Sequence, residues 1–168
     1  MLRQHIHILK MGGTIEFIDP AYDEINKKLL KLDSRIESYL QSIIKPHFNF
    51  STENIVEKDS REINQEDREK LAKVINLTSH QNIIITHGTF TMRETVQFLE
   101  KQTFDNKKII ITGSMIPITG FSTSDAGFNL GYSIASFGSI KPGVYLSMNG
   151  GIFTSIEVEK NVDLFRFE

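Results

Sequence analysis

The sequence predicts an α/β domain with a mostly parallel sheet. Two observations lead to this prediction. Short strand-like runs alternate with helical segments along the chain, and two of these runs, residues 82–86 and 108–112, each hold three consecutive isoleucines between polar residues. Continuous apolar runs of this length suit strands that are buried on both faces, as in a parallel sheet. Alternation of strands and helices with right-handed crossovers then builds the sheet.

The expected strands are short runs rich in apolar residues that end at glycine or polar side chains. In chain order they are residues 5–11, 53–58, 82–86, 108–112 and 143–148, followed by a ribbon over residues 152–158. The first ends at a Gly-Gly pair, and the second, ENIVEK, is a weaker pattern than the first.

Four helices are expected between these strands. Asp33 or Ser34 can cap the first, which ends near Pro46. Its apolar face consists of Ile36, Tyr39, Leu40, Ile43 and Ile44. Asn64 can cap the second, and Asp67 favours its early turns because the helix dipole is positive there. The inward-facing residues of this second helix are Leu71, Val74, Ile75 and Thr78.

The remaining two helices are expected over residues 91–102 and 125–137, the latter capped by Ser124. In open α/β sheets, ligands bind beyond the carboxyl ends of the strands. Candidate functional residues are therefore expected in the segments that follow the strands.

Composition excludes several classes of protein. The 168 residues carry 19 basic and 21 acidic side chains, for a net charge of −2, which argues against nucleic acid or a membrane surface as partner. The chain has no cysteine, so a disulfide framework, a zinc–thiolate site and a thiol nucleophile are excluded. His5 and His7 share a strand face without further ligands at suitable spacing, so no metal site is expected. Since no signal-peptide core or spanning segment is found, we expect a cytoplasmic protein.

Four segments that follow expected strands combine glycines with hydroxyl side chains. They are Gly12-Gly13-Thr14-Ile15, Asp59-Ser60-Arg61, His87-Gly88-Thr89-Phe90-Thr91 and Gly113-Ser114-Met115-Ile116-Pro117. Glycines permit tight turns and let backbone N–H groups approach a ligand. We expect the hydroxyls of Thr14, Ser60 and Thr89 to project into one crevice.

Each segment also has a purely structural explanation. Gly-Gly-Thr is an ordinary turn, Thr89 can cap the helix that begins near Thr91, and Asp59-Ser60 can be a cap or a turn pair. A structural role does not require glycines and hydroxyls to recur at successive strand ends. Their recurrence therefore favours a functional site.

Several segments resemble the signatures of the L-asparaginase family. ILKMGGTIE resembles the first signature and ITHGTFTMRET the second, while TGSMIPI and SDAGFNL match further motifs. SMNGGIFTSIEVEKN is similar to the segment that delivers the family's catalytic lysine, which falls on Lys160. The resemblance runs from about residue 5 to 161. It implies the three-layer, flavodoxin- or Rossmann-like α/β/α fold of the family's N-terminal domain, and residues 1–168 are expected to be that domain with the C-terminal domain absent.

The resemblance also implies roles for individual residues. Thr14 is the expected nucleophile, and Thr89 and Lys160 form the pair that moves protons. This agrees with chemistry, because a threonine hydroxyl needs a base and a desolvated lysine amine can provide one. Positions that match the family's substrate contacts, or lie in the glycine turns whose N–H groups can stabilise an oxyanion, are Gly13, Tyr22, Ser60, Gly88 and Ser114.

Two positions depart from the family pattern. Phe90 stands where relatives carry an aspartate that completes the triad and grips the substrate's α-ammonium, and Arg61 stands where relatives often carry a neutral polar residue. An unpaired ammonium beside Phe90 would be costly to bury. We therefore expect the bond-breaking residues to remain while recognition of a free amino group has changed.

Together these features predict an amidohydrolase that releases ammonia from asparagine or a related small carboxylate-bearing amide without a cofactor. An alternative is a degenerate domain of the same family that binds a small carboxylate without catalysis or serves as an assembly partner. A nucleotide-binding flavodoxin-like protein ranks last, because the sequence has no Gly-x-Gly-x-x-Gly and no Gly-Lys-Ser/Thr loop. By the same resemblance, we expect a homo-oligomer, a dimer or a tetramer.

Overall fold

A six-stranded sheet forms the centre of the structure. The computed structural model describes residues 4–16, 35–119 and 123–168. In these ranges the strand order is β2-β1-β3-β4-β5-β6, with the first five strands parallel and β6 antiparallel to β5. The strands are β1 His5–Gly12, β2 Asn49–Lys58, β3 Asn82–Thr86, β4 Lys108–Thr112, β5 Gly143–Met148 and β6 Gly151–Phe153. The predicted α/β class with a mostly parallel sheet is confirmed.

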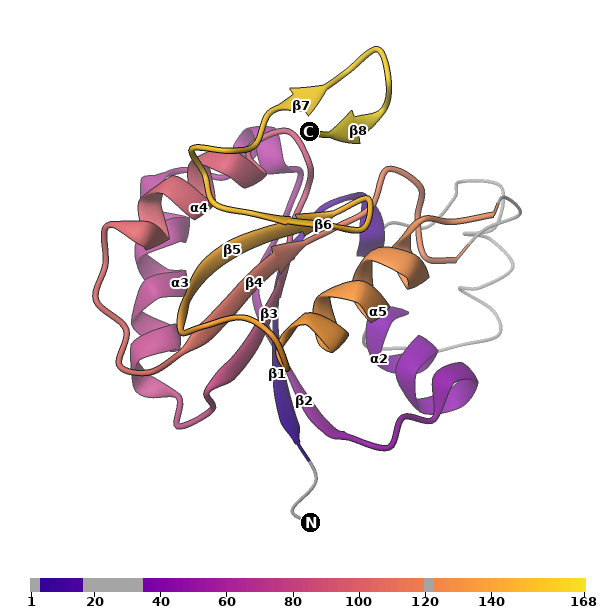
Figure 1. Ribbon diagram of the computed structural model, residues 1–168, viewed down its shortest axis with the longest axis horizontal. Helices are drawn as coiled ribbons and strands as arrows, with labels where there is room; N and C mark the ends of the chain where they lie inside the picture. Colours follow the sequence, from indigo (N-terminus) through magenta and orange to yellow (C-terminus); the bar gives the residue numbers. More distant parts are fainter. Residues whose placement is uncertain (1–3, 17–34, 120–122) are drawn as a thin grey trace.

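Helices cover both faces of the sheet and complete a three-layer α/β/α arrangement. Figure 1 shows α3 and α4 on one side and α2 and α5 on the other. The helices are α2 Arg35–Ser38, α3 Gln65–Leu77, α4 Met92–Glu100 and α5 Ala126–Ser136. Shorter turns are the 3₁₀ segments η1 Thr14–Glu16 and η3 Ser60–Glu62 and the π-helix η2 Tyr39–Ile44. Within the described ranges, every helix is too short or too polar to cross a membrane.

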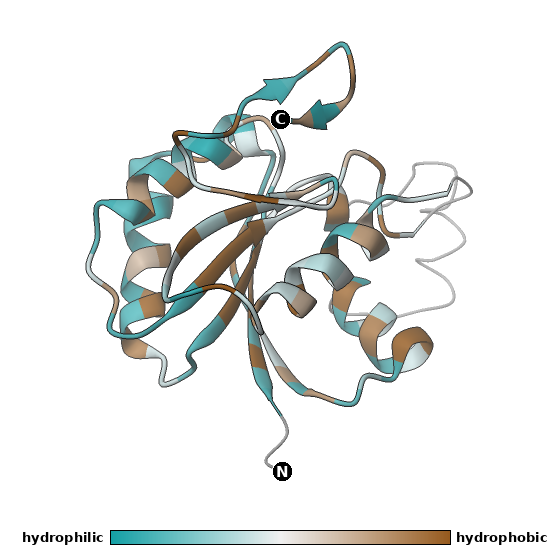
Figure 2. Cartoon of the chain, viewed as in Figure 1, coloured by the Kyte–Doolittle hydropathy of each residue, from teal (hydrophilic) through white to brown (hydrophobic). Residues whose placement is uncertain are grey.

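The isoleucine triplets divide their side chains between two hydrophobic clusters. Ile83 and Ile85 pack into the cluster on the α3 and α4 side, and Ile84 packs into the cluster on the α2 and α5 side. None of the three has exposed surface, and the triplet of β4 follows the same pattern. Figure 2 shows the hydrophobic strands between the helices. Each such side chain contributes about 1.5–3 kcal/mol to folding, which explains why both strands are continuously apolar.

The first predicted helix changes type in its middle. α2 continues as the π-helix η2, whose wider turn rotates its last residues away from the sheet. Ile43 and Ile44 are 68% and 45% exposed, so the prediction that both belong to an inward apolar face was wrong. The candidate caps Asp33 and Ser34 lie outside the described residues.

Two other boundaries differ from the prediction. β2 begins at Asn49 rather than at residue 53, because it is an edge strand of the sheet and its polar side chains reach solvent. The ribbon predicted over 152–158 is a strand only in its first part. β6 ends at Phe153, and the chain then turns away from the sheet.

The predicted caps have different outcomes. The Asn64 cap is confirmed, since its side chain accepts a hydrogen bond from Asp67 N at 3.1 Å and Asp67 accepts one from Asn64 N at 3.0 Å. At α5 the N-cap position belongs to Asp125, not to Ser124. The carboxylate of Asp125 accepts hydrogen bonds from the segment after β4, while Ser124 Oγ accepts one from Ala126 N at 3.0 Å.

Candidate active site

Two glycines at the end of β1 let three strand ends meet closely. Gly12 and Gly13 have φ angles of 77° and 85°, which side chains rarely adopt. A Cβ atom on Gly12 would lie 2.5 Å from Lys58 O, and one on Gly13 would lie 2.3 Å from Gly88 N. Gly13 N donates to Lys58 O at 3.2 Å, so this N–H is already engaged. Only glycine fits at either position. Because Gly13 packs on Gly88, the residues that follow them, Thr14 and Thr89, come from neighbouring strand ends.

Ser60 belongs to the same group of strand ends. It is 2% exposed, and a Cβ atom on Gly88 would lie 2.6 Å from its Oγ atom. Ser60 Oγ accepts a hydrogen bond from Phe90 N at 3.2 Å, and Thr91 Oγ1 donates to Ser60 O at 2.5 Å. The two residues that follow Thr89 are therefore hydrogen-bonded to Ser60, which fixes the Ser60 segment against the Thr89 segment.

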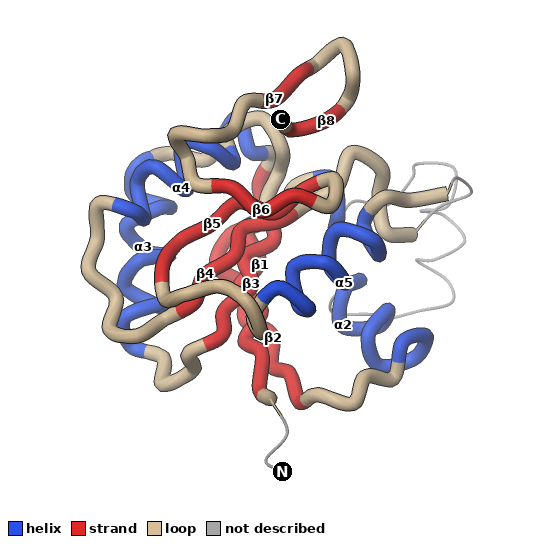
Figure 3. The backbone as a smooth tube through the Cα atoms, in the orientation of Figure 1, coloured by secondary structure: helices blue, strands red, loops and turns tan. Residues whose placement is uncertain are grey.

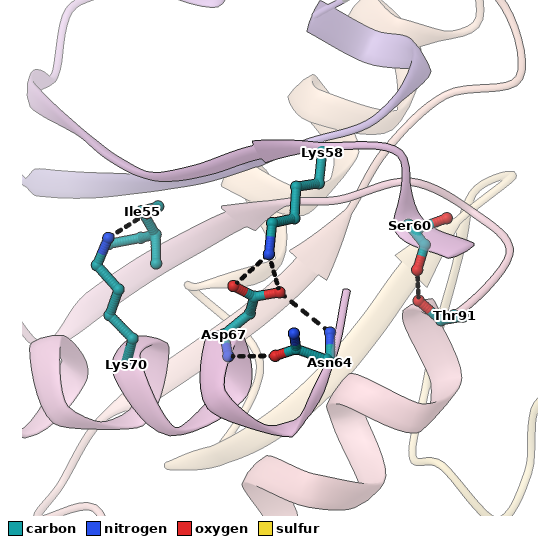
Figure 4. A network of polar contacts seen from close by, with 7 residues as sticks. All are labelled: Ile55, Lys58, Ser60, Asn64, Asp67, Lys70 and Thr91. Carbon is teal, nitrogen blue, oxygen red and sulfur yellow. Dashed lines mark hydrogen bonds and ion pairs between the residues drawn. The ribbon is translucent and has the colours of Figure 1, made fainter. Parts of the chain in front are cut away.

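An ion pair lies beside the Ser60 segment, between the end of β2 and α3 (Figure 4). Lys58 Nζ donates to the two carboxylate oxygens of Asp67 at 2.8 and 2.7 Å, which binds the end of β2 to the first turn of α3. Burial opposes ionisation of Asp67, but the hydrogen bonds from Lys58 and Asn64 outweigh it and lower the pKa of this carboxyl. The charged pair thus holds β2 and α3 together directly before Ser60.

Lys160 contacts Thr89 across the top of the sheet. Lys160 Nζ lies 2.8 Å from Thr89 Oγ1, and Thr89 is 6% exposed. Burial lowers the pKa of the Lys160 amine, which makes its neutral form easier to reach. The structure thus brings together the two residues that were expected to form a hydroxyl–amine pair. The structural alternative was that Thr89 caps the helix that begins near Thr91. In the structure, its Oγ1 atom instead accepts a hydrogen bond from Lys160.

A small hairpin carries Lys160 to this position. The hairpin consists of β7 Lys160–Asn161 and β8 Arg166–Phe167, and Figure 3 shows it beyond the edge of the main sheet. Val158 and Phe167 are buried in the core cluster on the α3 and α4 side, and Phe167 N donates to Asn149 Oδ1 at 3.0 Å. The lysine is therefore placed by residues anchored in the core on both sides of the hairpin.

Two positively charged side chains lie against the ring of Phe90. It is 56% exposed, with Lys160 Nζ 4.1 Å and Arg61 Cζ 4.8 Å from its centroid. Arg61 also pairs with Asp59 at 2.9 Å, and its hydrogen bonds lower the pKa of that carboxyl to about 2. Over the described part of the chain, no carboxylate lies within ion-pair distance of Lys160.

The remaining predicted residues are placed differently. Thr14 is half-buried at the start of η1, and its hydroxyl has no hydrogen-bond partner in residues 4–16, 35–119 and 123–168. Ser114 is fully buried, and its hydroxyl donates to Ile116 O at 2.6 Å within the turn after β4. Tyr22 lies outside the described residues.

A buried chain of hydrogen bonds through His87, behind the site, was not predicted from the sequence. His87 is fully buried, its Nδ1 donates to Gly88 O at 2.8 Å, and its Nε2 therefore accepts from Thr95 Oγ1 at 2.9 Å. Arg68 Nε donates to the same Thr95 hydroxyl at 3.1 Å. Burial lowers the pKa of His87 to about 4, so the ring is neutral and fixes the peptide before Thr89. A histidine directly after a buried strand is the signal that could have identified it.

The chemistry available at this site is that of hydroxyls, backbone amides and an amine. In the part of the chain that the structure describes, no three side chains of the metal-binding types are placed to share an ion. Such a set suits the transfer of an acyl group to a hydroxyl with an amine as proton acceptor.

The sequence matches the family described as asparaginase, N-terminal, over residues 5–164. The probable L-asparaginase periplasmic of Haemophilus influenzae is 33% identical over 166 residues, which cover 93% of this chain and 46% of that protein. L-asparaginase 2 of Escherichia coli is 31% identical over 163 residues, again covering 93% of this chain and 46% of the relative. The chain thus spans about half the length of these relatives.

Solved structures agree with the sequence comparison. The probable cytoplasmic L-asparaginase from Campylobacter jejuni matches with a TM-score of 0.78 at 29% identity, over 99% of this chain and 53% of that one. L-asparaginase I from Vibrio cholerae matches with a TM-score of 0.81 at 25% identity, over 99% and 51%. Because the family match covers nearly every residue and both structures share the fold, this chain belongs to the asparaginase family.

Proposed function

We propose that this chain provides the reaction centre of an amidohydrolase that releases ammonia from small amides bearing a carboxylate. The observation that carries the proposal is the 2.8 Å contact between Lys160 Nζ and Thr89 Oγ1 at the carboxyl ends of the strands. Relatives named L-asparaginase and glutaminase-asparaginase support this class of reaction.

In the proposed reaction, the hydroxyl of Thr14 attacks the amide carbonyl. Its proton passes to the Thr89–Lys160 pair, with the neutral lysine amine as acceptor. Backbone N–H groups of the turn at Gly88 and Thr89 stabilise the oxyanion. The C–N bond then breaks, the pair returns the proton to the leaving nitrogen, and ammonia departs. Water hydrolyses the resulting ester and frees the Thr14 hydroxyl.

The charges around the site support a substrate with a carboxylate and without a free amine. Ser60 Oγ accepts from Phe90 N and keeps its own proton to donate to a carboxylate. Arg61 and Lys160 add positive charge nearby, and Asp59 is engaged by Arg61. An α-ammonium in this place would meet like charges, so we expect succinamate to be preferred over asparagine.

An assay of ammonia release from asparagine, glutamine and succinamate tests the proposal. We expect turnover of at least one of these amides, lost in Thr14→Ala and in Thr89→Ala. Lys141→Met, at an exposed lysine remote in sequence from the site, is the matched control and retains activity. Absence of ammonia with all three amides, or turnover that Thr14→Ala does not change, would overturn it.

A second candidate function is binding of a small carboxylate without catalysis. The exposed ring of Phe90 between two cations favours it, because this arrangement attracts an anion as readily as it serves a reaction. Calorimetry with succinate and aspartate distinguishes the two functions. Binding of a dicarboxylate by a protein that turns over none of the amides would select the second.

A further inference from the structure

Phe90 presents more than half of its surface to solvent, yet it has specific neighbours. Lys160 Nζ and Arg61 Cζ lie 4.1 and 4.8 Å from its ring centroid, both inside the roughly 6 Å range of a cation–π interaction. Core packing does not account for the position of an exposed ring. The two cations are the contacts that give it a defined place.

Phe90 and the residues on both sides of it are hydrogen-bonded. Its N–H donates to Ser60 Oγ at 3.2 Å, and the next residue, Thr91, donates to Ser60 O at 2.5 Å. The preceding residue, Thr89, accepts from Lys160 Nζ. The ring is therefore presented at a fixed point directly beside the Lys160–Thr89 contact.

The ring face is the attractive partner that the structure offers to the Lys160 ammonium. Neighbouring carboxylates are engaged elsewhere: Asp59 pairs with Arg61 at 2.9 Å, and Glu159 pairs with Arg93 at 3.4 Å. In the described ranges no carboxylate pairs with Lys160. An aromatic face is negative at its centre, so it attracts the ammonium without offering a proton acceptor.

We propose that Phe90 is a positioning residue whose ring holds the Lys160 ammonium beside Thr89 in the resting site. A ring attracts an ammonium less strongly than a carboxylate does, so it orients the lysine while leaving the amine free to lose its proton. The catalytic meaning of this inference rests on the proposed function, but its test does not require turnover.

Fluorination of the Phe90 ring tests the inference, because it weakens the negative ring face with little change in size. Mono-, di- and trifluorinated phenylalanine would be placed at position 90 of the full chain. The apparent pKa of Lys160 would be read from competitive trace acetylation, followed by peptide mass spectrometry across a pH series. We expect a stepwise fall that reaches about half a pH unit in the trifluorinated protein, since the charged form loses attraction.

The same series at Phe128, an exposed ring that stacks on Tyr132, is the control and should leave the Lys160 pKa unchanged. A Lys160 pKa that stays constant across the Phe90 series would overturn the inference, as would an equal shift in the Phe128 series. The Lys160 pKa is measured without substrate in both series. A protein that releases no ammonia would therefore end the proposed function, while the acetylation series would still decide whether the Phe90 ring acts on Lys160.

Discussion

Lys160 Nζ and Thr89 Oγ1 lie 2.8 Å apart, although 71 positions separate the two residues in the sequence. The hydroxyl follows the buried strand β3, and the amine comes from a hairpin at the far end of the chain. Both ends of this contact are held by buried neighbours, so the pair is a built feature of the fold. Substitutions at the pair and around it can test its chemistry and its support separately.

Removing the amine should abolish most of the activity. We expect Lys160→Met to lower kcat for ammonia release by about 100-fold or more, since general base catalysis typically contributes that much. Lys160→Arg should fail similarly, because arginine stays protonated and cannot act as a base. Lys141→Met supplies the control, and circular dichroism verifies folding of each variant. Activity within about twofold of the wild type in Lys160→Met would refute the role of the amine.

Placing a carboxylate at position 90 should change substrate preference. We expect Phe90→Asp to raise kcat/KM for asparagine relative to succinamate by about tenfold, which corresponds to about 1.4 kcal/mol, because an anion there can pair with the α-ammonium. Phe90→Asn introduces a side chain of the same size as aspartate without its charge. It should leave the ratio of kcat/KM for asparagine to that for succinamate near the wild-type value. An unchanged ratio in both variants would contradict the explanation of specificity from Phe90.

Breaking the ion pair between Lys58 and Asp67 should lower the stability of the fold. We expect Asp67→Asn to lower the free energy of unfolding by about 2 kcal/mol in urea titrations, because the α3 cap weakens and Lys58 loses its partner. Glu69→Gln, at an exposed position of the same helix, should change it by less than about 0.5 kcal/mol. Equal stability of the two variants would show that the pair does not support the segment.

Stability should fall in acid because of His87. Its pKa is about 4 in the folded protein against an ordinary value of 6.5, so the folded state binds protons less readily than the unfolded state. The contribution of the neutral His87 ring to the free energy of unfolding is therefore intact above pH 6.5. It is lost between pH 6.5 and 4, and the loss amounts to about 3 kcal/mol. Burial also lowers the pKa values of His7 and His80, which act in the same direction.

The variant His87→Gln isolates this contribution, since an amide can make similar hydrogen bonds without titrating in this range. Urea unfolding at several pH values should give a shallower decline for the variant than for the wild type. Parallel declines in the two proteins would assign the acid sensitivity to other groups.

Self-association is expected through the hairpin that carries Lys160. Val162, Leu164 and Phe165 are each more than half exposed on it, which is unusual for three apolar residues so close together. We expect light scattering to give a mass of about twice 19.2 kDa, and Val162→Thr with Leu164→Ser to reduce it. A mass of 19.2 kDa at all concentrations would contradict this prediction.

Much of the fold could be predicted because its signals are local. Strands β3 and β4, which hold the isoleucine triplets, have the bounds that were predicted. Both strands are buried on both faces, and their continuous apolar composition indicates this burial. The start of β2 and the π-helix η2 were not predicted, because an edge strand tolerates polar residues and a change of helix type leaves the apolar spacing intact.

The site was less accessible to prediction from single residues. Lys160 has no distinguishing pattern of its own, and only the motif around it pointed to a role. The hydrogen bonds that link His87, Thr95 and Arg68 join three separate elements, so the place of His87 after a buried strand could indicate the histidine but not its partners. Long-range hydrogen bonds of this kind depend on packing that a sequence pattern does not record.

The close packing of Gly13 on Gly88 divides the site into positions that can vary and positions that cannot. Any side chain at either glycine would separate the strand ends, whereas Phe90 and Arg61 are exposed and tolerate exchange without disturbing the core. Evolution can therefore adjust what this scaffold accepts by single substitutions at its rim. The strand ends that carry Thr14 and Thr89 stay in place through such changes, because the glycine contact between them is not altered.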